Sequence, residues 1–126
     1  MAAHAPARKS VLLVEDDEET GAAKVAVLQD AGYHVTLAGD GEEALGLLSQ
    51  EPLPDLILLD MLMPGMDGWH FLQHIKAKPN LRTVPIVIVT GTILTLEWAH
   101  AHGCCGILHK PIDPEALLRE VRRCVA

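Results

Sequence analysis

Polar residues that can do chemistry follow four short apolar runs of this sequence. Each apolar run has the length of a β-strand, and the polar residues stand where that strand would end. Because the carboxyl ends of parallel strands meet at one edge of a sheet, we expect these side chains to share one crevice. The candidates, in chain order, are the acidic run Glu15, Asp16 and Asp17, the carboxylate Asp60, the hydroxyl of Thr90 and the amine of Lys110.

This set of side chains favours the binding of a divalent cation together with a phosphoryl group. Carboxylates that are brought together raise one another's pKa unless a positive charge compensates them. Mg²⁺ prefers oxygen ligands, and one or two carboxylates plus a phosphoryl oxygen would suit it. Lys110 adds a second positive charge that can meet a phosphoryl oxygen, and Thr90 offers a hydroxyl. The residues therefore predict a phosphate site.

The elements that must position these residues can be predicted from apolar periodicity. Strand-length apolar runs alternate with helix-like stretches, which predicts βαβ units. Runs 56–59 and 86–89 show no polar alternation, as expected of central strands covered on both faces. The helix signals are Gly32 at the end of the first helix, Asp40 before the second and Asp113-Pro114 before the last, and the fourth helix is expected to be short, at about 93–102. We predict an α/β fold, a doubly wound (βα)5 domain with a five-stranded parallel sheet.

Four motifs in this order resemble the receiver domain family of two-component response regulators. They are Glu15-Asp16-Asp17, Asp60 with Met63-Pro64-Gly65-Met66-Asp67-Gly68, Thr90-Gly91, and Lys110-Pro111, within residues 10–125. The resemblance implies a flavodoxin-like sheet in the strand order 2-1-3-4-5, with Asp60 as the phosphoacceptor. It also implies Mg²⁺ held by Asp16, Asp17, Asp60 and the main-chain carbonyl of Leu62, a phosphoryl group contacted by Thr90 and Lys110, and a cis peptide bond before Pro111.

The activity that the resemblance implies is a signalling switch and not a turnover enzyme. A sensor histidine kinase or phosphotransfer protein would supply the phosphoryl group, and a downstream output protein, or a second copy in a homodimer, would recognise the product. Ile107 stands where the family usually has an aromatic residue, and the interval from Thr90 to Lys110 is shorter than usual. An alternative is therefore a phosphorylation-independent scaffold or dimerisation module that uses the altered face of the fourth helix.

Length and composition set limits on the class of protein. The 126 residues are 49% hydrophobic and 21% charged, which is typical of one globular domain, and we expect a flexible N-terminal tail over 1–9 and the receiver domain over 10–126. The net charge of −7 disfavours direct binding to a nucleic-acid backbone, and no apolar run reaches the ~20 residues of a membrane span. Cys104, Cys105 and Cys124 form no C-x-x-C pair, so we predict reduced thiols and a cytoplasmic location.

Overall fold

The computed structural model describes residues 8–61 and 67–125 as a five-stranded parallel sheet with helices on both faces. The strands lie in the order β2-β1-β3-β4-β5, so the predicted fold class and strand order are confirmed. The strands are β1 (Ser10–Val14), β2 (His34–Ala38), β3 (Leu56–Asp60), β4 (Ile86–Thr90) and β5 (Gly106–His109). The helices are α1 (Glu18–Asp30), α2 (Gly41–Leu48), α3 (Gly68–Lys76), α4 (Leu96–Ala101) and α5 (Pro114–Val125).

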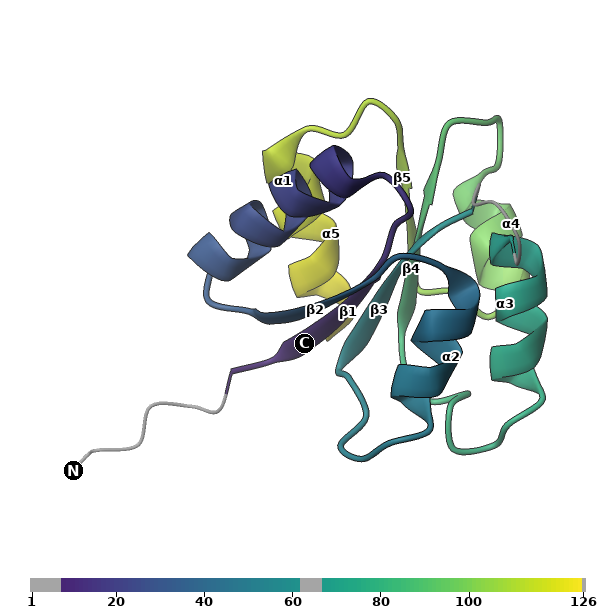
Figure 1. Ribbon diagram of the computed structural model, residues 1–126. Coiled ribbons are helices and arrows are strands. Elements are labelled where there is room, and N and C mark those ends of the chain that lie inside the picture. The colour runs from purple at the N-terminus through teal and green to yellow at the C-terminus, as the bar shows by residue number, and fades with distance from the viewer. Residues whose placement is uncertain (1–7, 62–66, 126) are drawn as a thin grey trace.

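Two apolar layers hold the helices on the sheet. Every residue of β3 and of β4 is buried, as predicted for strands without polar alternation. Successive side chains of a strand point to opposite faces, so Ile57 and Leu59 join one layer while Leu56 and Leu58 join the other. Figure 1 shows α1 and α5 on one face of the sheet and α2, α3 and α4 on the other.

Side-chain caps set where the helices begin. Asp40 accepts a hydrogen bond from the main-chain nitrogen of Glu43, and Asp113 accepts one from that of Ala116, which confirms both predicted caps. Thr95 caps α4 by accepting from the main chain of Trp98 at 3.0 Å. Because this cap lies inside the interval predicted as helix, α4 is shorter than the predicted 93–102 and begins only at Leu96.

The prediction that all three cysteines stay reduced was wrong for two of them. Cys105 forms a disulfide with Cys124, and their α-carbons are 6.0 Å apart. The two residues are 19 positions apart in the sequence, and they meet because the end of α5 packs beside the start of β5. Cys104 is a free, buried thiol, and burial raises its pKa to about 11.

Residues 1–7 lie outside the described part of the chain, so the expected tail stays a prediction. Among the described residues, no helix is long and apolar enough to cross a membrane.

Candidate functional site

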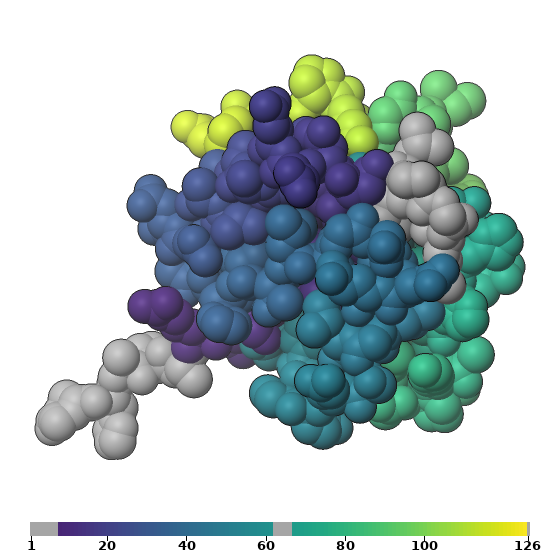
Figure 2. Space-filling view, viewed as in Figure 1, coloured from purple at the N-terminus to yellow at the C-terminus, as the bar shows by residue number. Residues whose placement is uncertain are grey.

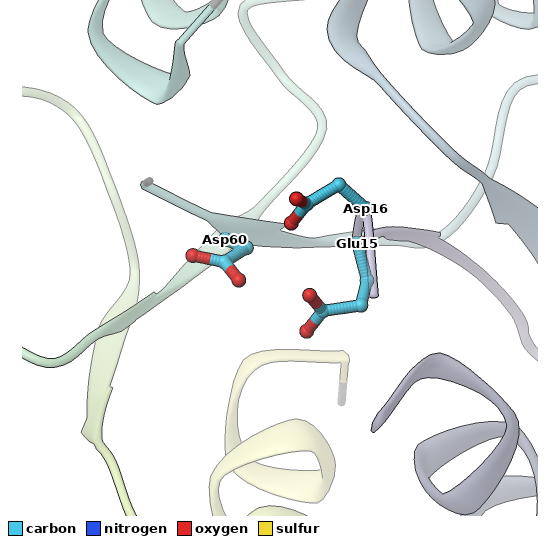
Figure 3. A group of neighbouring side chains, drawn as sticks. All are labelled: Glu15, Asp16 and Asp60. Atoms are coloured by element: carbon cyan, nitrogen blue, oxygen red, sulfur yellow. The ribbon is translucent and has the colours of Figure 1, made fainter. Parts of the chain in front are cut away.

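Three carboxylates meet where β1 and β3 end side by side. In the parallel pairing of these strands Val14 lies opposite Leu59, so the residues that follow, Glu15 and Asp60, are neighbours across the ladder. Oxygen atoms of Glu15, Asp16 and Asp60 all lie within 4.8 Å of one another. Figure 3 shows the side chains of Glu15 and Asp16 extending from the end of β1 toward Asp60. We call these three residues the acidic cluster.

The acidic cluster is buried on one side and open on the other. Glu15 is 3% exposed and Asp60 is 2% exposed, whereas Asp16 is exposed. Burial raises the pKa of the Glu15 carboxyl; bonding to Lys24 works in the opposite direction, and the nearby Asp60 adds to the rise. A bound cation would stabilise the ionised form of these carboxylates, because its positive charge offsets their mutual repulsion.

Lys110 supplies the predicted positive charge beside Asp60. It follows β5, and its Nζ donates a hydrogen bond to Oδ2 of Asp60 at 2.8 Å. Partial burial is the largest single influence and disfavours the ammonium form. The bond to Asp60, together with the negative charges of Asp60, Glu15 and Asp16, outweighs it, so the pKa of Lys110 is raised. The peptide bond between Lys110 and Pro111 is cis. Asp60 and Lys110, fifty residues apart, are therefore brought together as predicted from the strand ends.

A second lysine at the site was missed by the sequence reasoning. Lys24 of α1 is buried, and its Nζ lies 2.7 Å from Oε1 of Glu15. The buried residues of α1 are Gly21, Lys24 and Leu28, which occupy one helical face. The helical spacing of Lys24 from Gly21 and Leu28 was a signal that its side chain is buried, although that spacing does not identify Glu15 as its partner.

Asp17, predicted as a metal ligand, lies outside the group of carboxylates with metal-ligand spacing, although it lines the cavity over that group. It is the N-cap of α1, and its Oδ2 accepts a hydrogen bond from the main-chain nitrogen of Thr20 at 2.8 Å and another from the Thr20 hydroxyl. These bonds to Thr20 lower the pKa of Asp17. The group with metal-ligand spacing therefore contains Glu15 in place of Asp17. The other predicted ligand, the carbonyl of Leu62, lies outside the described residues.

Thr90 stands at the end of β4, beside the strand that carries Asp60. It is buried, and its hydroxyl lies 2.9 Å from that of Thr92 and accepts a hydrogen bond from the Thr92 main-chain nitrogen at 3.1 Å. Thr90 is thus near the site, but its hydroxyl is hydrogen-bonded to Thr92 in the loop that follows β4.

Ile107, at the position where the family usually has an aromatic residue, is partly buried against the apolar layer under α2, α3 and α4.

A cavity of about 420 Å³ opens over the acidic cluster between α1 and the segment that leads into α5. Figure 2 shows the start of α1, in purple and dark blue, beside yellow-green atoms of that segment at the upper edge of the view. The cavity is large enough for a phosphoryl group with its bound waters. Its charged lining comprises Glu15, Asp16, Asp17, Lys24, Asp60 and Lys110.

The donor set of the acidic cluster fits a hard divalent cation. All three residues offer carboxylate oxygens, and the exposed position of Asp16 leaves a path to solvent. Mg²⁺ is held in proteins by one or two carboxylates together with waters and phosphate oxygens. Glu15, Asp16 and Asp60 are thus the described residues that could hold it.

Comparisons with known proteins agree with this geometry. A family model described as the response regulator receiver domain matches residues 11–122. The chain is 35% identical over 120 residues to Response regulator Rre1 of Synechocystis sp., covering 93% of this chain and 52% of that protein. It is 30% identical over 118 residues to Protein PilH of Pseudomonas aeruginosa, covering 91% of this chain and 97% of that protein.

The fold of this chain is also similar to that of solved structures. The chemotaxis protein CheY4 of Vibrio cholerae has a TM-score of 0.84 and 34% identity, and the match covers 93% of this chain and 98% of that one. The chain spans about half the length of Rre1, at 52%, and about a quarter of PleD of Caulobacter vibrioides, at 25%. The fold, the acidic cluster with Lys110, and the family match over residues 11–122 lead to one conclusion: this chain belongs to the response regulator receiver domain family.

Proposed function

We propose that Asp60 accepts a phosphoryl group in a reaction that depends on Mg²⁺, and that this switches the binding of a partner protein. The observation that carries the proposal is the position of Asp60, which lies in the acidic cluster and is bonded to Lys110 at 2.8 Å. Receiver domains are signalling modules that are typically phosphorylated and bind Mg²⁺. The chain would thus be a switch whose chemistry occurs on its own carboxylate.

In the proposed reaction a carboxylate oxygen of Asp60 attacks the phosphorus atom of a phosphohistidine donor. The new oxygen–phosphorus bond forms as the phosphorus–nitrogen bond breaks, and the electron pair leaves with the donor's histidine nitrogen. Lys110 offsets negative charge on the phosphoryl oxygens, to which its ammonium can donate. Mg²⁺, which Asp16 and Asp60 would hold, would supply further neutralisation of that charge.

The proposed metal ligands are Asp16 and Asp60, and Glu15 is the third carboxylate beside the cation, where Asp17 was first expected. The main-chain carbonyl of Leu62 remains part of this proposal, although it lies outside the described residues. In the proposed switch, the Thr90 hydroxyl exchanges its contact with Thr92 for a phosphoryl oxygen. That movement would shift the loop between β4 and α4, and so bias the surface around α4 and β5 between two states.

The partners belong to the same proposal. Response regulators interact with histidine kinases and output domains. We assign this chain a sensor histidine kinase or phosphotransfer protein as donor and an output protein as recipient, with a homodimer as one form of output. A cytoplasmic location is part of the same proposal and rests on these partners alone, because the Cys105–Cys124 disulfide removes the reduced thiols from which that location was first predicted. The alternative, a scaffold or dimerisation module that does not depend on phosphorylation, predicts partner binding that phosphorylation leaves unchanged.

Phosphorylation can be tested with a small acyl-phosphate donor and Mg²⁺, followed by intact mass spectrometry. We expect the wild type and Asp40→Asn, which alters an exposed helix cap, to gain one phosphoryl group, and Asp60→Asn to gain none. Removal of Mg²⁺ by a chelator should abolish the gain. An unmodified wild-type mass would contradict the proposal. A mass gain that changes no partner affinity would instead favour the scaffold.

A further inference from the structure

Lys24 is a buried cation that contacts the acidic cluster from α1. Its side chain is 7% exposed and that of Glu15 is 2% exposed, and Nζ lies 2.7 Å from Oε1. The other oxygen of Glu15, Oε2, accepts a hydrogen bond from the main-chain nitrogen of Asp17 at 3.3 Å. Both oxygens of Glu15 are therefore engaged by donors of the β1–α1 segment.

A gain in stability does not readily explain why the Lys24–Glu15 ion pair is buried. The cost of removing two charges from water often equals or exceeds their mutual attraction, so well-packed apolar residues serve a core at least as well. Lys24 lies on the same helical face as Leu28, where an apolar side chain would satisfy the packing. The place of Lys24 beside the acidic cluster points to a role in the charge of the site.

The charges of the acidic cluster and of the two lysines bonded to it are nearly balanced. The acidic cluster contributes three negative charges, and Lys24 and Lys110 contribute two positive ones, so the net charge is −1. A bound divalent cation would change this to +1. Phosphorylation replaces one carboxylate charge by about −2, which would bring the metal-bound site to about zero. Without Lys24, the metal-bound site would already be neutral before phosphorylation.

We propose that Lys24 is a positioning residue of the metal site. Its ammonium group holds Oε1 of Glu15 away from direct metal ligation, leaves Asp16 and Asp60 as the carboxylates that contact the cation, and lowers the affinity of the unphosphorylated site for divalent cations. This inference rests on the proposed function, because it concerns the same cation. It goes further by assigning to α1 the control of how tightly that cation is held before phosphorylation.

The test is direct measurement of Mn²⁺ binding to the unphosphorylated protein, by the electron paramagnetic resonance signal of free Mn²⁺, with Mg²⁺ as competitor. We expect Lys24→Gln to bind Mn²⁺ about five- to tenfold more tightly, the effect of one charge on a divalent ion several ångströms away when solvent at the open side of the site screens the interaction. Lys24→Arg keeps the charge and should stay within about twofold of the wild type. An unchanged or weaker affinity in a folded Lys24→Gln would overturn the proposal.

A second comparison covers the case in which Lys24→Gln does not fold. The variants Glu15→Gln and Glu15→Gln/Lys24→Gln differ only in whether Lys24 is present. We expect Glu15→Gln alone to bind Mn²⁺ more weakly and the double variant to return close to wild-type affinity. A double variant as weak as Glu15→Gln would show that Lys24 does not offset Glu15, and would overturn the inference.

The variant Asp16→Asn distinguishes a failure of the proposed metal site from a failure of the proposed role of Lys24. Loss of wild-type Mn²⁺ binding in Asp16→Asn, combined with an unchanged affinity in Lys24→Gln, would contradict only the role of Lys24. A wild type that binds no Mn²⁺, or an Asp16→Asn that binds it as well as the wild type, would contradict the proposed metal site and the role of Lys24 together.

Discussion

Asp16 and Asp17 are neighbours in the chain, yet only Asp16 faces Asp60. The backbone of Asp17 is extended, and its side chain turns back to cap α1 through Thr20. Three consecutive acidic residues do not reveal from the sequence which of them caps the helix and which of them enter the site. Their roles depend on the backbone conformation between β1 and α1. In the structure the carboxylates with metal-ligand spacing are those of Glu15, Asp16 and Asp60, while the side chain of Asp17 caps α1.

This assignment predicts different effects on metal binding at adjacent residues. Asp16→Asn should lower the Mg²⁺ affinity at least tenfold, because a ligand is lost. Asp17→Asn should change the affinity by no more than about threefold, since only a distant charge is lost and asparagine still caps the helix. Isothermal titration with Mg²⁺ would measure both. If Asp17→Asn lost as much affinity as Asp16→Asn, the original choice of Asp17 as a ligand would be correct.

The start of α3 lies directly against Met61, the residue that follows Asp60. The main-chain nitrogen of Gly68 donates to the carbonyl of Met61 at 3.2 Å. A β-carbon added to Gly68 would lie 2.6 Å from the α-carbon of Met61 and 2.7 Å from its sulfur. No side chain fits there unless α3 or the end of β3 shifts.

Gly68→Ala should therefore destabilise the protein by about 1–3 kcal/mol, the usual cost of overpacking. Gly46→Ala is the matched control, because Gly46 also lies in a helix and nothing is found within 4 Å of its added β-carbon. That control should be neutral or stabilising by up to about 1 kcal/mol. Urea unfolding followed by circular dichroism would measure both changes. Equal stability of the two variants would show that α3 adjusts without cost.

The disulfide joins the start of β5 to the end of α5, the two elements that flank Lys110 in the chain. Its reduction should lower the free energy of unfolding by about 3 kcal/mol, as expected for a closed loop of this length. The measurement is urea unfolding with and without a reducing agent. The variant Cys105→Ala/Cys124→Ala should not respond to the reducing agent. A wild type that also failed to respond, with three thiols titrated after unfolding, would show that the bond does not form.

The sheet and its functional edge could be predicted because both depend on the pattern of apolar and polar residues within short stretches of the chain. Uninterrupted apolar runs identified the central strands, and the polar residues after them identified the edge where Asp60 and Lys110 meet. Lys24 and the cysteine pair could not be predicted in this way. Their partners lie on other elements, at spacings set by how α1 and α5 pack on the sheet. Those contacts exist only once the layers have assembled.

The same dependence on assembly predicts that Mg²⁺ stabilises the folded protein. Glu15 and Asp16 meet Asp60 only when β1 pairs with β3, so the unfolded chain offers no equivalent site. A ligand that binds only the folded state at ten times its dissociation constant adds about 1.4 kcal/mol to the free energy of unfolding. Urea unfolding at rising Mg²⁺ and constant ionic strength should show this gain in the wild type. Asp16→Asn should gain no more than about 0.4 kcal/mol over the same range, because its affinity is at least tenfold lower. An equal gain in both proteins would mean that Mg²⁺ acts elsewhere on this acidic molecule.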